Sequence, residues 1–550
     1  MSQLAEDAIV AATAAILAWR LCAAGWFAEA GAIALLVVGA CAVQALAHQR
    51  GQRSPCGPVG YPCRSGASWG LTLGCSTPGL VVCALSLARA QSDLRLGPLR
   101  AYMWAASACG AHTLLSFAAA RARGASRARL VSLLVTCTLL GVLSPALLLG
   151  RRAALLCIVA LAVSSALFNG ALCVVEQCFT PGEASTLAQA GALLFADVLV
   201  LTRCETASPD LLREPAHSMC TPRDEALSVA EVGLCGALLL ATGLAILMQS
   251  VPLHLTPHRR AAVFYSASAG GVAVLLSRLT RLLGGRSPLV WLLRLCSARG
   301  GALLIALWAI AVPLGSVAAA RLVEAVADPS RQVVRRRLTL ARKAYHLLVL
   351  LIVLPALPHH RELLHLALVV AMALFALVEV VRANRVPPLA AHVDRFMRRF
   401  VDARDGRALL LTHQYLLAGC ATPLLLCSSI DLDSSSHTRA PLARAAAPLA
   451  GLIAVGIGDA VASAVGAHCG RLCWPGTTKT VEGSAAAAAA MLMALSLFRR
   501  ISGIADSVSE RRDVGWVGAC TCAVCLLEAT TSQIDNLYLP LLYLTLLLLA

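Results

Sequence analysis

Acidic, basic, hydroxyl and glycine residues gather in residues 456–484 of a chain whose other segments are mostly apolar. This stretch contains Lys479, one of only two lysines among the 46 basic residues. Asp459 and Ser463 are four residues apart, so they share one face of a helix. An aspartate at the end of an apolar helix is costly unless a cation or a metal pairs with it. These residues therefore indicate a site that binds a cation.

Glycines, hydroxyls and charged groups follow in residues 470–483. Glycines leave backbone N–H groups accessible, hydroxyls donate hydrogen bonds, and Arg471 and Lys479 add positive charge. Such a set of donors suits the phosphates of a polyphosphate. The P-loop pattern GxxxxGK[ST] and the protein-kinase signatures do not occur in the sequence. Gly458, Ala462, Gly466 and Gly470 recur every fourth residue, which also predicts a close helix–helix contact.

The second lysine lies in another group of donors. Arg342, Lys343 and His346 fall within four residues, and their spacing puts His346 on one helix face with both cations. Three donors at a membrane surface suit a phosphate or a pyrophosphate. The alternative is a basic anchor whose side chains reach the membrane interface.

Carboxylates that could hold a metal occur in a polar link at residues 400–415. Asp402 and Asp405 precede Thr412 and His413, which begin an apolar run. Mg²⁺ takes one or two carboxylates together with substrate phosphates, so these aspartates could contribute to such a site. A solvated loop of ion pairs is the alternative.

Two more polar groups interrupt the apolar runs. Glu379 and Arg382 are best explained as an interfacial ion pair that ends a helix. Glu528, Thr531 and Asp535 are expected to share one helical face. Polar groups on consecutive turns between apolar runs face a protein interior or a wet cavity. A purely structural hydrogen-bonded network is the alternative for this second group.

The order of these motifs resembles that of the polyprenol kinase family. The resemblance covers about residues 335–545 and is carried by ARKAYH (341–346), VEVVRANRVPPL (378–389), VDARDGRALLLTHQYLL (401–417), GDAVAS (458–463), WPGTTKTVEG (474–483) and EATTSQIDNLYLP (528–540). Upstream, FTPGEASTLAQA (179–190) is similar to a weaker signature of the long branch of the family, which acts on dolichol. Shorter relatives carry only the C-terminal motifs.

The resemblance implies a reaction and a location. In this family, CTP donates its γ-phosphate to the terminal hydroxyl of a polyprenol; for dolichol the products are dolichyl phosphate and CDP, which serve protein glycosylation. Expected partners are dolichol or another polyprenol and the lipids of the endoplasmic reticulum membrane, with the CTP site facing the cytosol. A divalent cation, expected to be Mg²⁺, would accompany CTP.

The family's CTP-binding motif corresponds to residues 459–483 of this chain, and the wider family treats the positions of Arg342, Lys343, Asp459 and Gly466 as essential. The nucleotide is therefore expected to bind at Gly458, Ser463, Gly466, Gly470, Arg471, Trp474, Pro475, Gly476, Thr477, Thr478, Lys479, Thr480, Glu482 and Gly483. Three positions depart from the family pattern. Thr478 replaces a second lysine, Ala403 replaces a glutamate, and Pro181 replaces an apolar residue.

Phosphoryl transfer needs in-line positioning and neutralisation of phosphate charge. We expect Asp459, with Asp405 or Asp535, to hold the metal. Arg342 and Lys343 would stabilise the transferred group, and Arg471 and Lys479 would bind CTP. The base that an alcohol nucleophile needs stays open among His346, His413 and Asp459.

These residues must be positioned by membrane-spanning helices. The 550 residues are 58% hydrophobic and 14% charged, with a mean hydropathy of +0.75, which is not a soluble composition. Apolar runs near membrane-spanning length predict an all-α, polytopic integral membrane protein with roughly 13–16 transmembrane helices. Residues 1–325 are expected to be a multi-span scaffold facing lipid, and residues 326–550 the catalytic region. The acidic start of the chain argues against a cleavable signal peptide.

Charge and cysteine content exclude other classes. The net charge of +17 comes from arginines in short links, which set topology and meet anionic headgroups, so nucleic acid is not an expected partner. Most of the 22 cysteines lie in apolar runs and behave as small hydrophobes. The rival functions are a phytol or diacylglycerol kinase that uses CTP, a CTP:lipid cytidylyltransferase and, more remotely, a transporter. A transporter would require inverted repeats and broken helices, and no repeat is visible.

Overall fold

The computed structural model of the chain describes residues 2–49, 64, 67–90, 97–122, 124–175, 178–206, 224–252, 255–324, 331–400, 408–428, 442–502 and 510–550. Helices make up nearly all of these residues, and the one β-bridge found among them joins Cys473 to Thr480. The predicted all-α fold is therefore confirmed.

The helices follow one another along the chain with short links. The first 206 residues contain α1 (Ser2–Ala23), α2 (Phe27–Gln49), α3 (Leu71–Ala90), α4 (Gly97–Arg121), α5 (Gly124–Leu149), α6 (Arg151–Val174) and α7 (Pro181–Thr206). The middle contains α8 (Glu225–Ser250), α9 (Pro257–Leu282), α10 (Pro288–Ser297), η3 (Ala298–Gly300), α11 (Gly301–Glu324), α12 (Arg331–Val353), α13 (Arg361–Ala383), α14 (Ala390–Met397) and η4 (Arg398–Phe400). The last part contains α15 (Thr412–Cys427), α16 (Leu442–Ala446), η5 (Ala447–Leu449), the π-helical segment η6 (Leu452–Asp459), α17 (Ala460–Cys469), α18 (Val481–Ile501), α19 (Glu510–Thr530) and α20 (Asp535–Leu548).

The length and composition of these helices fit a membrane protein. Within the described ranges, 12 helices are long and apolar enough to cross a bilayer. Three further helices, α1, α4 and α12, are 22, 25 and 23 residues long. The chain is therefore a multi-pass membrane protein, as expected from its sequence.

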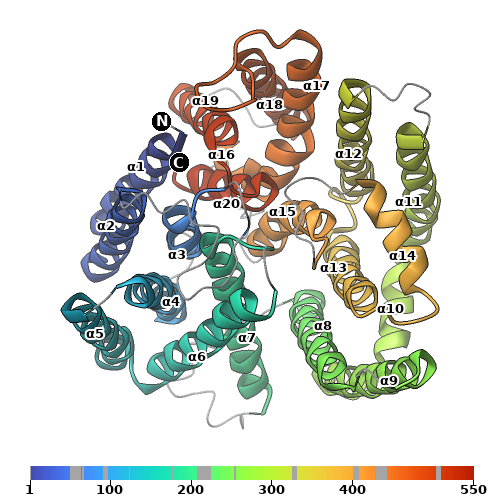
Figure 1. Cartoon of the computed structure of the whole chain (residues 1–550), viewed down its shortest axis with the longest axis horizontal. Helices are drawn as coiled ribbons and strands as arrows, with labels where there is room; N and C mark the ends of the chain where they lie inside the picture. The colour runs from blue at the N-terminus through green and yellow to red at the C-terminus, as the bar shows by residue number, and fades with distance from the viewer. Residues whose placement is uncertain are drawn as a thin grey trace.

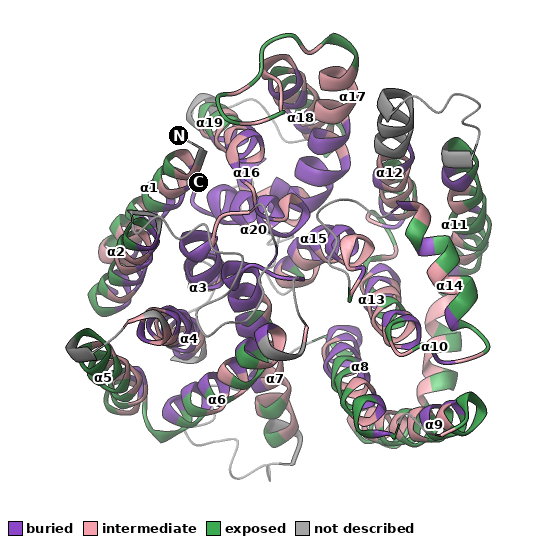
Figure 2. Ribbon diagram, viewed as in Figure 1, coloured by how far each residue is buried: buried purple, intermediate pink, exposed green. Residues whose placement is uncertain are grey.

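Burial distinguishes inner from outer helices. In the most apolar stretch of α3, 94% of residues are buried, against 11% in α5 and 6% in α9. Figure 2 shows the same contrast, with buried α3 and α20 at the centre and exposed faces on the peripheral helices. Large apolar side chains such as Leu147, Val274 and Leu303 are exposed on those outer faces. In a membrane such faces meet lipid, so the central helices form the protein interior.

The two ends of the chain lie side by side and share this interior (Figure 1). The main hydrophobic cluster joins Leu17 of α1 and Leu73 of α3 to Tyr538 and Leu547 of α20. In addition, the Arg20 guanidinium donates a 2.8 Å hydrogen bond to the backbone oxygen of Leu549. The regions 1–325 and 326–550 therefore share one hydrophobic core, and their division into scaffold and catalytic parts stays a prediction about function.

Candidate active site

The site is built around the π-helical segment η6, which ends at the buried Asp459. π-Helical turns are rare and occur often at functional sites. Neighbouring helices pack tightly on this segment. A Cβ atom at Gly456 would lie 2.9 Å from the Leu350 side chain of α12, and one at Gly458 would lie 2.7 Å from Met491 Sδ of α18. The glycines thus let α12 and α18 approach the segment that positions Asp459.

The basic group of α12 reaches the same segment. Lys343 forms an ion pair with Asp459, and His346 Nδ1 lies 3.7 Å from Asp459 Oδ2. His346 Nδ1 is also 2.9 Å from the backbone oxygen of Val455. Because a carbonyl oxygen only accepts, Nδ1 donates this bond, and neutral His346 keeps a lone pair on Nε2. From α17, Ser463 Oγ donates a 3.4 Å hydrogen bond to Asp459 Oδ1.

Three carboxylates meet at this place. Asp459, Glu528 and Asp535, from η6, α19 and α20, each offer an oxygen within 4.8 Å of the other two. The sequence prediction that Asp459 and Asp535 could share a metal is compatible with this arrangement. Sequence reasoning did not include Glu528 as a ligand. The feature of the sequence that could have identified Glu528 as a ligand is its position in an apolar run, seven residues before Asp535.

The second lysine approaches the carboxylates from the loop that precedes α18. Lys479 Nζ lies 2.6 Å from Glu528 Oε1 and 3.9 Å from Asp535 Oδ2, and it also donates to the backbone oxygen of Glu528. The two lysines of the chain thus pair with two different members of the carboxylate cluster. Three carboxylate oxygens this close to one another repel, so the cluster favours a cation between them.

A tight turn shapes the loop that carries Lys479. Trp474, Pro475, Gly476 and Thr477 form a type II turn, with proline second and glycine third at a φ of 76°. The Thr477 N–H closes this turn with a 3.1 Å bond to the Trp474 oxygen, and the Trp474 N–H donates to the Lys479 oxygen at 2.9 Å. Thr478, Pro475 and Gly476 are exposed. The loop is therefore a short hairpin with an open outer face.

Two other predicted nucleotide-binding residues help to close the hairpin. The Glu482 carboxylate accepts bonds of 3.1 Å from the Arg471 N–H and 3.0 Å from the Leu472 N–H. Thr480 caps α18, because its hydroxyl accepts a 3.2 Å bond from the Gly483 N–H. The Arg471 side chain is exposed. These contacts position the loop whether or not the same residues also touch a nucleotide.

Gly466 and Gly470, two of the residues predicted to allow close packing, lie where α17 meets the start of α18, opposite Gly483. A Cβ atom at Gly466 would lie 2.9 Å from Thr480 Oγ1, and one at Gly483 would lie 2.7 Å from the Ala462 oxygen. Gly470 likewise has no room for a side chain beside Thr480. The close helix contact predicted from the glycine spacing is confirmed.

Other predicted residues are found elsewhere or are not described. His413 packs its ring against Tyr345, Phe400 and Phe375, with ring centroids 5.3, 6.0 and 6.3 Å away. Arg342 is half-buried on α12, next to Lys343. Asp405, proposed as a metal ligand, lies outside the described residues, as do Asp402 and Ala403. His346 therefore lies beside Asp459, whereas His413 lies among aromatic rings.

The ion pair expected at the end of α13 is present and buried. Arg382 Nη2 lies 2.6 Å from Glu379 Oε1. Glu379 also accepts a 2.6 Å bond from the Leu410 N–H, and Arg382 donates a 2.8 Å bond to the Ala408 oxygen. The pair therefore holds the start of α15, the helix that carries His413.

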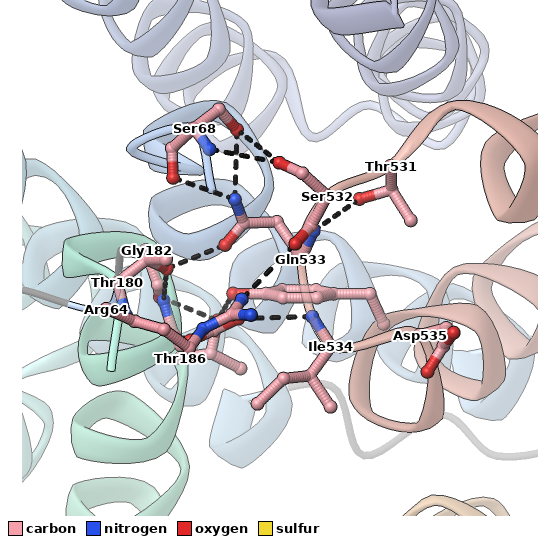
Figure 3. Close-up of polar contacts among 12 residues, drawn as sticks. Arg64, Ser68, Thr180, Gly182, Thr186, Thr531, Ser532, Gln533, Ile534 and Asp535 are labelled. Atoms are coloured by element: carbon pink, nitrogen blue, oxygen red, sulfur yellow. Dashed lines mark hydrogen bonds and ion pairs between the residues drawn. The ribbon is translucent and has the colours of Figure 1, made fainter. Parts of the chain in front are cut away.

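The helical face expected for Glu528, Thr531 and Asp535 is not continuous. α19 ends at Thr530 and α20 begins at Asp535, and residues 531–534 link the two helices. Figure 3 shows that this link is surrounded by polar groups of the N-terminal region, which satisfy hydrogen bonds that a helix would otherwise make. Glu528 and Asp535 thus come from two helices that meet at a break.

Comparison with known proteins identifies relatives of this chain. A family model described as dolichol kinase matches residues 155–438. The dolichol kinase of Homo sapiens is 34% identical over 386 residues, which cover 69% of this chain and 66% of that protein. Dolichol kinase EVAN of Arabidopsis thaliana is 37% identical over 211 residues, covering 38% of this chain and 35% of that protein.

The dolichol kinase of Saccharomyces cerevisiae is 34% identical over 150 residues, covering 27% of this chain and 25% of that protein. The match to the human relative spans just under two thirds of that protein's length. No solved structure matches the chain.

Proposed function

This chain belongs to the dolichol kinase family, and from that premise we propose that it transfers a phosphoryl group from a nucleotide to the terminal hydroxyl of dolichol. The observation that carries this proposal is the convergence of Lys343, Lys479 and three carboxylates at one partly buried site. Transfer of a phosphoryl group depends on positioning and on neutralisation of charge, and this site supplies charged groups of both signs.

We propose CTP as the donor. The resemblance of residues 458–483 to the family's CTP motif supports this choice, and so does the hairpin geometry. Lys479 leaves one arm of the hairpin and ends at the carboxylate cluster, whereas Thr478 and Arg471 are exposed on the outer side. A nucleotide over the hairpin would have its phosphates next to Lys479 and its cytidine outside. The glycines of α17 and α18 keep this hairpin close to Asp459.

The carboxylate cluster fits a divalent cation such as Mg²⁺. Its donors are hard oxygens from three elements, and Mg²⁺ is bound in many phosphoryl-transfer sites by one or two carboxylates together with substrate phosphates. Asp459, Glu528 and Asp535 would hold the ion. When bound, the ion supplies neutralisation of charge on the β- and γ-phosphates. Lys343 and Lys479 would then pair with phosphate oxygens, which are equivalent partners for an ammonium group.

His346 is the base that the geometry favours. Its Nδ1 donates to the Val455 oxygen, which fixes the ring and leaves Nε2 able to accept the proton of the dolichol hydroxyl. Asp459, the other candidate beside it, would be occupied by the cation. His413 is enclosed by aromatic rings and is better suited to packing.

The multi-pass helices support a reaction at a membrane, where the apolar tail of dolichol is soluble. We propose that this membrane is the endoplasmic reticulum, that the hairpin faces the cytosolic supply of CTP, and that the product serves protein glycosylation. The outer helices with exposed apolar faces offer the surface from which the lipid arrives.

Membranes containing the chain, dolichol and radiolabelled CTP test the proposal. Label in the γ-position should appear in dolichyl phosphate, and label in the α-position should not. Transfer of α-label would identify a cytidylyltransferase. Equal or better labelling from γ-labelled ATP would contradict CTP as the donor, and preference for phytol or diacylglycerol would contradict dolichol as the acceptor.

A further inference from the structure

The break between α19 and α20 separates two carboxylates of the candidate metal site. Glu528 lies two residues before the end of α19, and Asp535 is the first residue of α20. The position of one relative to the other therefore depends on the conformation of residues 531–534. Each of these four residues is held by a side chain from the first 190 residues of the chain. Figure 3 shows the contacts that Ser532 and Gln533 make with Arg64, Ser68 and Thr180.

Gln533 is the centre of this contact. Thr180 donates a 2.6 Å hydrogen bond to Gln533 Oε1, and Gln533 Nε2 donates to the Ser68 oxygen at 3.0 Å and to Ser68 Oγ at 2.9 Å. The Gln533 side chain is fully buried. A side chain at Gly70, whose φ is +61°, would overlap the Gln533 amide, so only glycine leaves room for it.

A buried ion pair holds the backbone on the other side of the break. Arg64 and Glu183 pair with each other, and their side chains are 5% and 0% exposed. The Ile534 N–H donates a 3.1 Å bond to Glu183 Oε1, and Arg64 Nη2 donates a 3.3 Å bond to the Ser532 oxygen. Each member of the pair thus also binds one backbone group of the break.

The start of α7 fixes Glu183 in this position. Thr180 and Glu183 form a capping box, in which the Thr180 N–H donates to Glu183 Oε2 at 2.9 Å and the Glu183 N–H donates to Thr180 Oγ1 at 3.2 Å. Pro181 occupies the first helical position, where a missing N–H costs nothing. The residues TPGE therefore form a rigid helix start that presents Thr180 and Glu183 to the break.

We infer that Arg64, Glu183 and Gln533 are positioning residues that set the placement of Asp535 against Glu528 and thereby the affinity of the carboxylate cluster for a divalent cation. This inference rests on the proposed function in one respect, namely that the cation bound by the carboxylates is the one that accompanies the nucleotide in the reaction. A role in packing alone would not require bonds to all four residues between the two ligands. Outer partners of metal ligands commonly change metal affinity by about 10- to 100-fold.

The test compares two variants with a matched control in the full-length protein in detergent. Gln533→Leu removes the amide contacts and leaves the Arg64–Glu183 pair intact, and Ser68→Ala is the milder second variant. Thr521→Val is the control, because it removes a buried 2.9 Å hydrogen bond between α19 and Tyr543 of α20 away from the break. Binding of Mn²⁺ alone is measured by electron paramagnetic resonance, and melting temperature reports stability.

We expect Gln533→Leu to weaken Mn²⁺ binding by about 10-fold and Ser68→Ala to weaken it by less. The Thr521→Val control should lose as much melting temperature while its Mn²⁺ affinity changes little. The half-saturating Mg²⁺ concentration for lipid phosphorylation should rise in parallel. The inference would be overturned if Gln533→Leu or Ser68→Ala, whichever accumulates, bound Mn²⁺ with the affinity of the parent chain. It would also be overturned if the Asp535→Asn variant bound Mn²⁺ as well as the parent chain does. Absence of lipid phosphorylation with normal Mn²⁺ binding would count against the proposed function alone.

Discussion

Lys343 and Lys479, the only two lysines of the chain, both end on one group of three carboxylates. Lys343 pairs with Asp459, and Lys479 pairs with Glu528. An ammonium group that pairs with a carboxylate can pair equally with a phosphate oxygen when a metal takes the carboxylate. The two lysines and the carboxylates thus provide complementary places for a metal and for the phosphates that it accompanies.

Replacing Lys343 by methionine should lower the rate of lipid phosphorylation by about 100-fold or more, because it removes the charge that we propose stabilises the transferred phosphate. Lys343→Arg should keep part of the rate, since it keeps the charge without the compact ammonium group. Rates are measured per amount of protein in membranes. Arg361→Met, at an exposed position at the start of α13, is the control and should behave as the parent. A Lys343→Met rate near the parent's would contradict this role.

Replacing Glu528 by glutamine should raise the half-saturating Mg²⁺ concentration by about 10-fold or more, because a ligand loses its charge while its shape is kept. The measurement is the phosphorylation rate at increasing Mg²⁺ and saturating CTP. Glu362→Gln removes a charge from an exposed position on α13 and should leave the curve unchanged. Identical curves for both variants would exclude Glu528 from the metal site.

Introducing lysine at Thr478, where the family resemblance implies a second lysine, should lower KM for CTP by up to about fivefold without changing kcat. The residue is exposed, and such a contact adds about 0.2–1 kcal/mol. The gain should fade as salt concentration rises. Ser502→Lys adds the same charge at the opposite end of α18 and is the control. A KM that responds equally to both changes would show only a general effect of charge.

Replacing Gly483 by alanine should destabilise the protein by about 1–3 kcal/mol, because the added methyl group meets the Ala462 oxygen and Thr480 Oγ1 at 2.7 and 3.0 Å. It should also raise KM for CTP, since the hairpin joins α17 to α18. Melting temperature in detergent gives the first effect. Gly515→Ala, where no atom lies within 4 Å of the added group, is the control. Equal melting temperatures for the two variants would contradict the close packing.

Local patterns made much of this site predictable. The four-residue spacing from Gly458 to Gly470 predicts the helix contact that the structure contains, because small residues on one face of an apolar helix let a second helix approach closely. Asp459 and Asp535 could be grouped as metal ligands because an ionisable residue in an apolar run needs a partner. The two lysines indicated the same place through their rarity.

Contacts between distant segments were not predictable. Residues 528–535 were expected to form one helical face, and no local signal indicates that Arg64 and Glu183 would satisfy the backbone of a break at residues 531–534. Because the sequence does not predict the break, it also does not predict that Glu528 lies beside Asp535. His413 was a candidate base from its residue type alone, whereas its aromatic neighbours come from three other elements.

The most direct measurement compares the parent chain with Asp459→Asn in membranes supplied with dolichol and γ-labelled CTP. Asp459 pairs with Lys343, accepts a hydrogen bond from Ser463 and has an oxygen within 4.8 Å of the other two carboxylates, so its charge is central to the site. We predict that the parent forms labelled dolichyl phosphate and that Asp459→Asn, at equal accumulation in the membrane, stays at background. Full transfer by Asp459→Asn, or no labelled lipid from the parent chain, would contradict the proposed phosphoryl-transfer site.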